Sequence, residues 1–230
     1  MAGSPETTGS SGFLWTESGG MQVVEAPPVS SGSPGLMLDG ISGDGLVAVG
    51  HASFDDPGGS STRSEAMRWR AGTGAVSLGT PPITDANGRI SVRAMDASYD
   101  GSAILVWASY RDTTGVLRDE PMLWSNGSMS FLGALAGDES SVALAISDDG
   151  STIVGHSILG TRGTAVRWVN GGQPVGLGNP VLRAATGVSP NGNHVVGIAG
   201  SWPNEQGYLW SSGGTGDPVL LGVPDGAEQT

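Results

Sequence analysis

Residues 142–157 read VALAISDDGSTIVGHS, and this stretch contains the pattern that decides the fold. An alternating apolar run ends at Ser147 and is followed by Asp148-Asp149-Gly150 and by a second run rich in β-branched residues. Asp and Gly tolerate the positive φ angles of tight hairpins, and β-branched side chains suit a pleated surface. The stretch therefore predicts two antiparallel strands joined by a short turn.

The same phrase, a serine, two residues, a glycine and an apolar run, recurs through the chain. Its copies are SGDGLVAVG from Ser42, SYDGSAILV from Ser98, SDDGSTIVG from Ser147 and SPNGNHVVG from Ser189, with turn glycines Gly45, Gly101, Gly150 and Gly192. Between copies, short segments end in a bulky residue, Leu or Arg, and a tryptophan: Trp15, Trp69, Trp124, Trp168 and Trp210. Repeats of this length made of strands and turns are typical of propeller blades, which run about 40–50 residues.

One repeat supplies four strands. After the hairpin, residues 164–169 form a third strand that carries Trp168, and residues 174–178 form a short outer strand. We therefore predict an all-β, propeller-like array of four-stranded antiparallel blades with essentially no helix, because no segment shows a sustained 3.6-residue apolar period. The predicted units are a half blade at 13–25 and blades at about 37–79, 92–133, 142–178 and 184–222.

These units form one predicted repeat domain, 13–230, behind a flexible N-terminal segment, 1–12. The chain opens before a third strand and ends where a further blade would begin, so we expect it to be cut from a longer array. In each copy the tryptophan is expected to pack between adjacent blades, because a large flat side chain buries the most area there.

Composition limits the function classes. The chain of 230 residues has 40 glycines, 14 prolines, no cysteine and a net charge of −12. All ten basic residues are arginines. This balance argues against nucleic acid or an anionic membrane surface as partner. No apolar stretch reaches the ~20 residues that a membrane-spanning helix needs, and the N-terminus lacks the pattern of a signal peptide.

The repeat resembles the HAF-type extracellular repeat. The resemblance rests on Ala66-Met67-Arg68-Trp69, on Ala165-Val166-Arg167-Trp168, on the serine-turn-glycine phrases and on the Leu-Gly pairs of the outer strands. Pro121 and Gly207 replace the family's alanine, and no copy has an intact His-Ala-Phe triplet. The Ser189 phrase also resembles blades of the periplasmic TolB-type propeller. The resemblance implies a bacterial secreted, cell-surface or autotransporter-like propeller repeat and assigns no catalytic residues.

Few residues carry recognisable chemistry. His51 and His156 share one repeat position, which Trp107 and Ile198 occupy elsewhere, so a packing role is expected. No metal-site spacing accompanies them. The acidic pairs at 55–56 and 148–149 could chelate calcium, but neither has the spacing of a calcium loop, so no cofactor is predicted.

The predicted binding surface is the face that carries the long, variable loops 26–34, 53–63, 80–90 and 110–118, because variable loops on a rigid scaffold usually carry binding. Its charged residues are Asp55, Asp56, Arg63, Asp85, Arg89, Arg111, Asp112, Arg118 and Asp119. Neutral variation of these loops is the competing explanation.

The sequence thus predicts a non-enzymatic module outside the cell or on its surface, which acts as an adhesive, a binder of a surface glycan or protein, or a scaffold. One alternative is a carbohydrate-active enzyme domain with carboxylates at the central channel, for which Asp39 and Asp96 qualify. Another is a structural subunit that self-associates through exposed blade edges.

Overall fold

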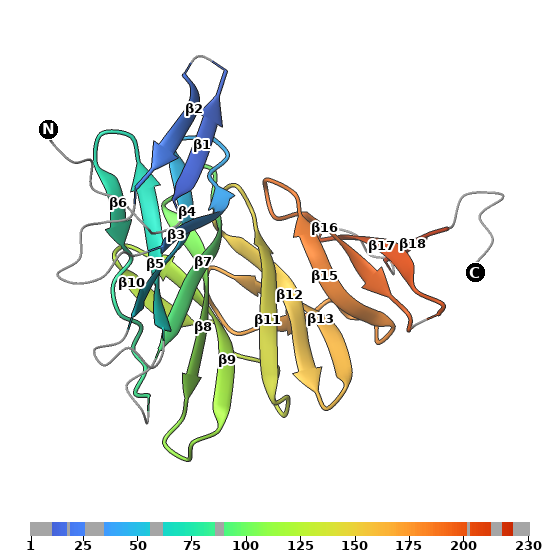
Figure 1. Cartoon of the computed structure of the whole chain (residues 1–230). Helices are drawn as coiled ribbons and strands as arrows, with labels where there is room; N and C mark the ends of the chain where they lie inside the picture. The colour runs from blue at the N-terminus through green and yellow to red at the C-terminus, as the bar shows by residue number, and fades with distance from the viewer. Residues whose placement is uncertain are drawn as a thin grey trace, which may run out of the picture.

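The computed structural model describes residues 11–17, 19–25, 35–55, 62–85, 90–201, 203–212 and 218–222. Its strands form one two-stranded hairpin and four four-stranded antiparallel sheets, which follow one another in chain order along an open arc (Figure 1). No helix occurs in the described residues. The predicted all-β array of four blades and a half blade is confirmed.

Each sheet takes its strands from consecutive segments of the chain. The half blade consists of β1 (Gly12–Thr16) and β2 (Gly20–Val24). Blade 1 consists of β3 (Gly35–Ile41), β4 (Val47–Asp55), β5 (Thr62–Arg70) and β6 (Gly74–Ser77). Blade 2 consists of β7 (Ser91–Ala97), β8 (Ala103–Arg111), β9 (Leu117–Ser125) and β10 (Ser128–Phe131).

Blades 3 and 4 repeat this arrangement. Blade 3 consists of β11 (Ser140–Ile146), β12 (Thr152–Leu159), β13 (Arg162–Val169) and β14 (Val175–Gly176). Blade 4 consists of β15 (Leu182–Val188), β16 (His194–Ala199), β17 (Gln206–Ser211) and β18 (Val219–Leu221). In every blade the first strand pairs with the second, the second with the third and the third with the fourth.

The strand ends differ from the predicted ones by a few residues. The inner strands β3 and β15 begin at Gly35 and Leu182, because both continue to pair with the far ends of β4 and β16. The outer strand of blade 3 shortens to Val175–Gly176, since the preceding Pro174 has no N–H to donate. β1 begins at Gly12, and residues 1–10 of the predicted N-terminal segment lie outside the described residues.

The serine-turn-glycine phrase closes the inner hairpin of every blade. In blade 3, Ser147 Oγ donates to Asp149 Oδ1 (2.6 Å) and accepts from the backbone N–H of Thr152 (3.0 Å). Asp149 Oδ1 also accepts from the N–H of Ser151 (2.9 Å), and Gly150 adopts φ 70°. Equivalent bonds occur in the turns that begin at Ser42, Ser98 and Ser189. The phrase is therefore a hydrogen-bonded turn whose glycine must take a left-handed conformation.

Backbone hydrogen bonds connect these turns from one blade to the next. The N–H of Asp44 donates to Tyr99 O (2.9 Å), and the N–H of Tyr99 donates to Asp148 O (2.8 Å). The N–H of Asp149 donates to Pro190 O (3.2 Å). These bonds hold adjacent blades in register at the turns between their first and second strands.

The main core lies between blades rather than inside them. Met122 and Trp124 of blade 2 pack with Val49 and Leu78 of blade 1, and all four side chains are buried. The indole Nε1 of Trp124 donates to the carbonyl oxygen of Leu78 (3.0 Å). Trp168 repeats this bond to Gly133 O (3.1 Å) in the next interface. Trp124 and Trp168 therefore cover the preceding blade and satisfy their polar N–H groups there. The expected packing between blades is wrong for Trp15, which is 63% exposed because the described residues place no blade before its hairpin.

Candidate ligand-binding recess between blades 1 and 2

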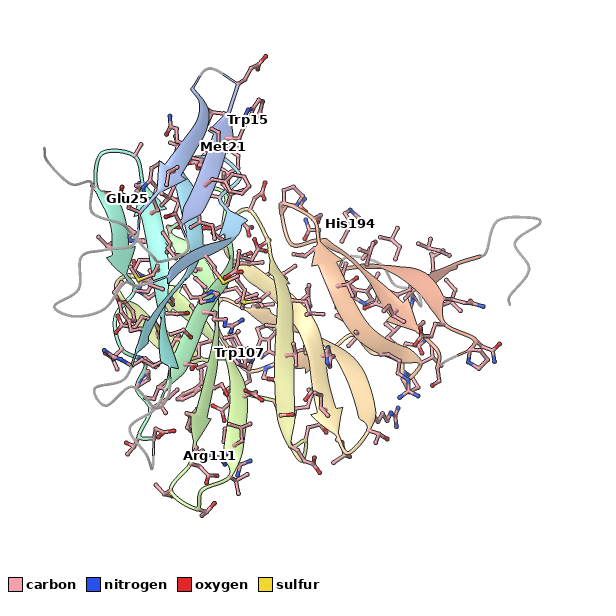
Figure 2. The ribbon with its side chains drawn as sticks, viewed as in Figure 1. Trp15, Met21, Glu25, Trp107, Arg111 and His194 are labelled. Carbon is pink, nitrogen blue, oxygen red and sulfur yellow. The ribbon has the colours of Figure 1, made fainter. Side chains whose placement is uncertain are left out.

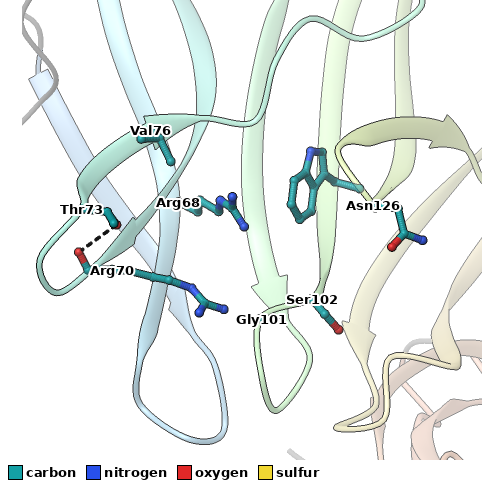
Figure 3. A pocket seen from close by; sticks show the side chains of 8 residues that line it. Arg68, Arg70, Thr73, Val76, Gly101, Ser102 and Asn126 are labelled. Carbon is teal, nitrogen blue, oxygen red and sulfur yellow. Dashed lines mark hydrogen bonds between the residues drawn. The ribbon is translucent and has the colours of Figure 1, made fainter.

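A recess of about 510 Å³ lies between blades 1 and 2 on the face that carries the short hairpin turns. Its lining comes from strands β5, β6 and β9 and from three turns: Arg68, Arg70, Thr73, Val76, Gly101, Ser102, Trp124 and Asn126 (Figure 3). Binding sites for small molecules usually have volumes of about 300–1,000 Å³ and a few convergent polar groups. This recess has both properties.

Two arginines supply the positive charge of the recess. Arg68 and Arg70 stand two residues apart on β5, so their side chains leave the same face of the strand and both extend toward blade 2 (Figure 3). The guanidinium of Arg68 lies over the ring of Trp124, with 4.9 Å from Cζ to the ring centroid. This stacking, a cation–π contact, holds the planar guanidinium in one orientation.

Arg70 is anchored to the neighbouring hairpin turn. Its Nη2 donates to the carbonyl oxygen of Asp100 (2.9 Å), while the rest of the side chain is exposed. The hydrogen bond from Ser42 lowers the pKa of the nearby Asp44 carboxyl, and the positive charge of Arg70 adds to this effect. In the described part of the chain, neither Arg68 nor Arg70 forms an ion pair.

The other interfaces show which part of this arrangement belongs to the repeat. Arg167 stacks over Trp210 between blades 3 and 4 (4.7 Å), as Arg68 does over Trp124. There, however, the residue two positions after the stacked arginine is Val169 rather than a second arginine. The stacked guanidinium is therefore a repeated packing device, and the second cation distinguishes the recess between blades 1 and 2.

The chemistry of the recess favours an anion. A guanidinium presents a planar fork of N–H donors that matches a carboxylate, sulfate or phosphate. Ser102, Thr73 and Asn126 add hydroxyl and amide groups at the rim. The arrangement can hold an acidic group between two cations while neutral hydroxyls of the same ligand bond to the rim.

The predicted long-loop residues form local pairs on the opposite face. The carboxylate of Asp85 accepts from the backbone N–H of Arg111, which joins the β6–β7 and β8–β9 loops. Arg111 stands at the far end of β8 from the short turns (Figure 2). The Asp112 carboxylate accepts from Thr114 Oγ1 (2.6 Å) and from Arg118 Nε (2.8 Å), and these hydrogen bonds lower the pKa of Asp112.

The structure describes the side chains of two of the remaining predicted binding residues, Arg63 and Asp119. Arg63 pairs with Glu65 (3.2 Å) and lies over the ring of Phe54 (5.6 Å). Asp119 is exposed on β9. The side chain of Asp55 and all of Asp56 and Arg89 lie outside the described residues. The binding role of the long-loop face stays a prediction.

The two carboxylates considered for catalysis serve different neighbours. Asp39 Oδ2 lies 2.8 Å from Nδ1 of the buried His51, at an irregular step in the pairing of β3 with β4. Asp96 accepts from the N–H of Ala97 (2.9 Å) and from the N–H of Ile146 in blade 3 (3.2 Å). Burial raises the pKa of Asp96, although both hydrogen bonds oppose the shift.

His156 occupies the same repeat position as His51 but lacks its partner, because Leu144 stands where blade 1 has Asp39. Its buried Nδ1 has no hydrogen-bond partner among the residues that the structure describes, and burial lowers the pKa of the ring. The ring lines a smaller recess of about 320 Å³ between blades 3 and 4, together with Arg183 and Glu205.

Neither a metal cluster nor a membrane-spanning helix is found in the described ranges. No three His, Cys, Asp or Glu side chains there gather closely enough to hold a metal ion. Asp149, one of the acids considered for calcium, accepts hydrogen bonds within its own turn. No helix in these ranges is long and apolar enough to cross a membrane.

Sequence reasoning did not select Arg68 and Arg70. Arg68 belongs to the repeated pattern, because an arginine before the tryptophan also occurs in blade 3, and Arg70 lies outside that pattern. The signal that distinguishes them is Arg68-Trp69-Arg70, which places two cations on one strand face next to the tryptophan of the following blade.

Comparison with known proteins supports the architecture. No protein-family model matches the chain, and no curated protein matches it. Among solved structures, TolB from Acinetobacter baumannii is 18% identical, with a TM-score of 0.51 over 87% of this chain and 45% of TolB. A putative TolB from Agrobacterium tumefaciens is 15% identical, with a TM-score of 0.52 over 90% of this chain and 72% of the other. The chain thus spans less than half of the first of these proteins, and at these identities the likeness shows a shared propeller-type β fold.

Proposed function

We propose that the chain is a non-enzymatic binding module and that the recess between blades 1 and 2 binds a small anionic ligand, such as an acidic sugar of a surface glycan. We further propose that it is a bacterial HAF-type repeat, exposed on the cell surface or secreted. The repeated sequence pattern supports this placement. The two arginines of the recess support the ligand class.

The observation that carries the proposal is the pairing of Arg68 and Arg70 in one recess of a strongly acidic chain. Neither guanidinium forms an ion pair in the described residues, although the chain has a net charge of −12 and Asp44 lies near Arg70. Arg68 is half buried and oriented by Trp124, so it loses little conformational freedom when a ligand binds. An ordered, unpaired guanidinium favours an anionic ligand.

A binding role also agrees with the carboxylates near the inner strands. Glycoside hydrolysis requires two carboxyl groups that flank one bond. Asp39 faces His51, while Asp96 accepts two backbone N–H groups and joins blade 2 to blade 3. Both carboxylates have local structural partners, which favours a module that binds over one that hydrolyses.

Calorimetric titration with glucuronate tests the proposal, with glucose as the neutral control. Glucuronate is expected to bind saturably and glucose is not. Arg70→Gln removes one charge-assisted hydrogen-bond donor and is expected to weaken glucuronate binding about tenfold or more, the equivalent of about 1.5–3 kcal/mol. Arg68→Gln is expected to weaken binding to a similar degree.

Arg167→Gln is the matched control, because Arg167 makes the same stacking contact in a different interface. It removes the same charge and an equivalent packing contact, and it is expected to leave glucuronate binding unchanged. Equal losses in Arg167→Gln and Arg68→Gln would show that binding reflects overall charge or stability. No saturable binding of glucuronate, sulfate or phosphate to the unaltered chain would refute the anion site.

A further inference from the structure

The N-terminal end of the array exposes a face that every other blade buries. The residue two positions before the tryptophan is 1% exposed at Met67 and 0% at Met122, Val166 and Tyr208, but 63% at Phe13. Trp15 itself is 63% exposed, whereas Trp168 is completely buried. Phe13 and Trp15 pair across the hairpin with Val23 and Met21, which are each 68% exposed. We call these four residues the N-terminal face.

The C-terminal end exposes the opposite face of a blade. The outer-strand position is buried at Val24, Leu78, Leu132 and Leu177, with exposures between 1% and 5%, but is 48% exposed at Leu221. The equivalent position on the second strand is 0–1% exposed at Val49, Leu105 and Val154, and 43% exposed at Val196. Leu209, beside Trp210, is 36% exposed. We call Val196, Leu209 and Leu221 the C-terminal face.

These two faces are the two sides of one interface that the chain already makes within itself. Met122 and Trp124 pack against Val49 and Leu78 between blades 1 and 2. The same positions meet between blades 2 and 3, between blades 3 and 4, and between the half blade and blade 1. The N-terminal face therefore has the side-chain pattern that the C-terminal face accepts.

We infer that the N-terminal face of one copy of the chain packs on the C-terminal face of a second copy, head to tail. Within one chain the two faces belong to opposite ends of the arc: the N-terminal face lies on the β1–β2 hairpin, where Figure 2 labels Trp15 and Met21, and the C-terminal face lies on blade 4. The contact is heterologous, so each added copy leaves one face open and association either continues or closes into a ring.

Apolar burial drives the contact between copies, and charge repulsion opposes it. Burial of exposed aromatic and aliphatic side chains favours the contact. The charge of −12 on each copy opposes it. Salt screens this repulsion, with a Debye length of about 8 Å at 0.15 M, and does not weaken apolar burial. Association is therefore expected to increase with both protein and salt concentration.

Two double variants test the inference by sedimentation equilibrium of the full chain. Phe13→Glu/Trp15→Glu blocks the N-terminal face, and Val196→Glu/Leu221→Glu blocks the C-terminal face. The unaltered chain is expected to exceed its monomer mass of 23.1 kDa as concentration rises, and each double variant is expected to remain monomeric. An equimolar mixture of the two keeps one intact face of each kind, so it is expected to form a heterodimer of about twice the monomer mass.

The mixing experiment separates this contact from its alternatives. Leu159→Glu alters a side chain of similar exposure, 53%, outside both faces and is expected to associate like the unaltered chain. Circular dichroism melting identifies any variant that fails to fold, and single substitutions at Trp15 and Leu221 then replace the double ones. Monomeric behaviour of the unaltered chain at high protein and salt concentration would overturn the inference. Self-association of one double variant on its own would do so as well. Loss of anion binding would leave this inference standing, because the recess shares no residue with either face.

Discussion

Ser147→Ala is expected to destabilise the protein strongly, because the serine hydroxyl serves two partners at a buried position. Ser147 is 1% exposed. Its Oγ donates to the Asp149 carboxylate (2.6 Å) and accepts from the N–H of Thr152 (3.0 Å), which is itself buried. Alanine removes a hydrogen bond to a charged group and leaves a buried N–H unpaired, for an expected loss of about 2–4 kcal/mol.

The matched substitution is Ser189→Ala, which has the same hydrogen-bond geometry with less burial and no charge. Ser189 Oγ donates to the neutral side chain of Asn191 (2.9 Å) and accepts from the N–H of His194. That N–H is exposed, so it can bond to water when the hydroxyl is removed. The expected loss is about 0.5–1.5 kcal/mol. Urea denaturation of both variants measures the difference, and hydrogen exchange at the Thr152 and His194 amides reports each turn separately. Equal losses, or a loss below about 1 kcal/mol at Ser147, would refute this reasoning.

Two further predictions concern backbone approach and pH. In Gly155→Ala, a Cβ atom would lie 2.0 Å from the carbonyl oxygen of Val142, so the strands must separate; we expect a loss of about 3 kcal/mol or more in urea denaturation. Gly176→Ala, with no atom within 4 Å of the added Cβ, is expected to change stability by less than about 0.5 kcal/mol. Burial raises the pKa of Asp96 above 3.8, so the folded state holds this proton more tightly than the unfolded chain. The contribution of the protonated Asp96 carboxyl to the free energy of unfolding is fully present below pH 3.8. It is lost as the pH rises through the raised pKa. The free energy of unfolding of Asp96→Asn, relative to that of the unaltered chain, should therefore be more favourable at pH 7 than at pH 3 when both are measured by chemical denaturation. An equal difference between the two proteins at both pH values would contradict the direction assigned to the pKa shift.

Much of the fold could be predicted from the sequence because its determinants are local. The serine-turn-glycine phrase specifies a hairpin through bonds between residues at most five positions apart, as between Ser147 and Thr152. The recurrence of tryptophan then gives the number of blades. Exact strand ends could not be predicted in this way, since β3 and β15 extend as far as their partners allow.

The candidate site could not be predicted because it depends on which side chains meet across blades. Arg68 and Trp124 are far apart in sequence and stack only because adjacent blades place them face to face. The long loops differ in length between blades and so stand out in the sequence, whereas the recess is lined largely by repeat positions. A single departure from the repeat, Arg70 where blade 3 has Val169, was the only local signal.

The exposure of the N-terminal and C-terminal faces also depends on contacts between blades, which the sequence of one repeat does not reveal. Phe13 and Leu221 occupy repeat positions whose other members are buried, and nothing in their own sequence distinguishes them. They are exposed because each repeat position needs a neighbouring blade on one particular side, and the described residues place no blade on that side of either one. Burial in a repeat array is decided by nearest neighbours.

Hydrogen exchange of the tryptophan indole N–H groups, followed by nuclear magnetic resonance, tests the central claim that each blade covers the tryptophan of the next one. Trp124 and Trp168 bond to carbonyl oxygens of the preceding blade, at 3.0 and 3.1 Å, and both are buried. Their indole protons are predicted to exchange slowly, while that of Trp15, 63% exposed, exchanges at close to the rate of a free indole in dilute solution. Exchange of Trp168 as fast as that of Trp15 would contradict the blade-to-blade packing on which both proposals rest.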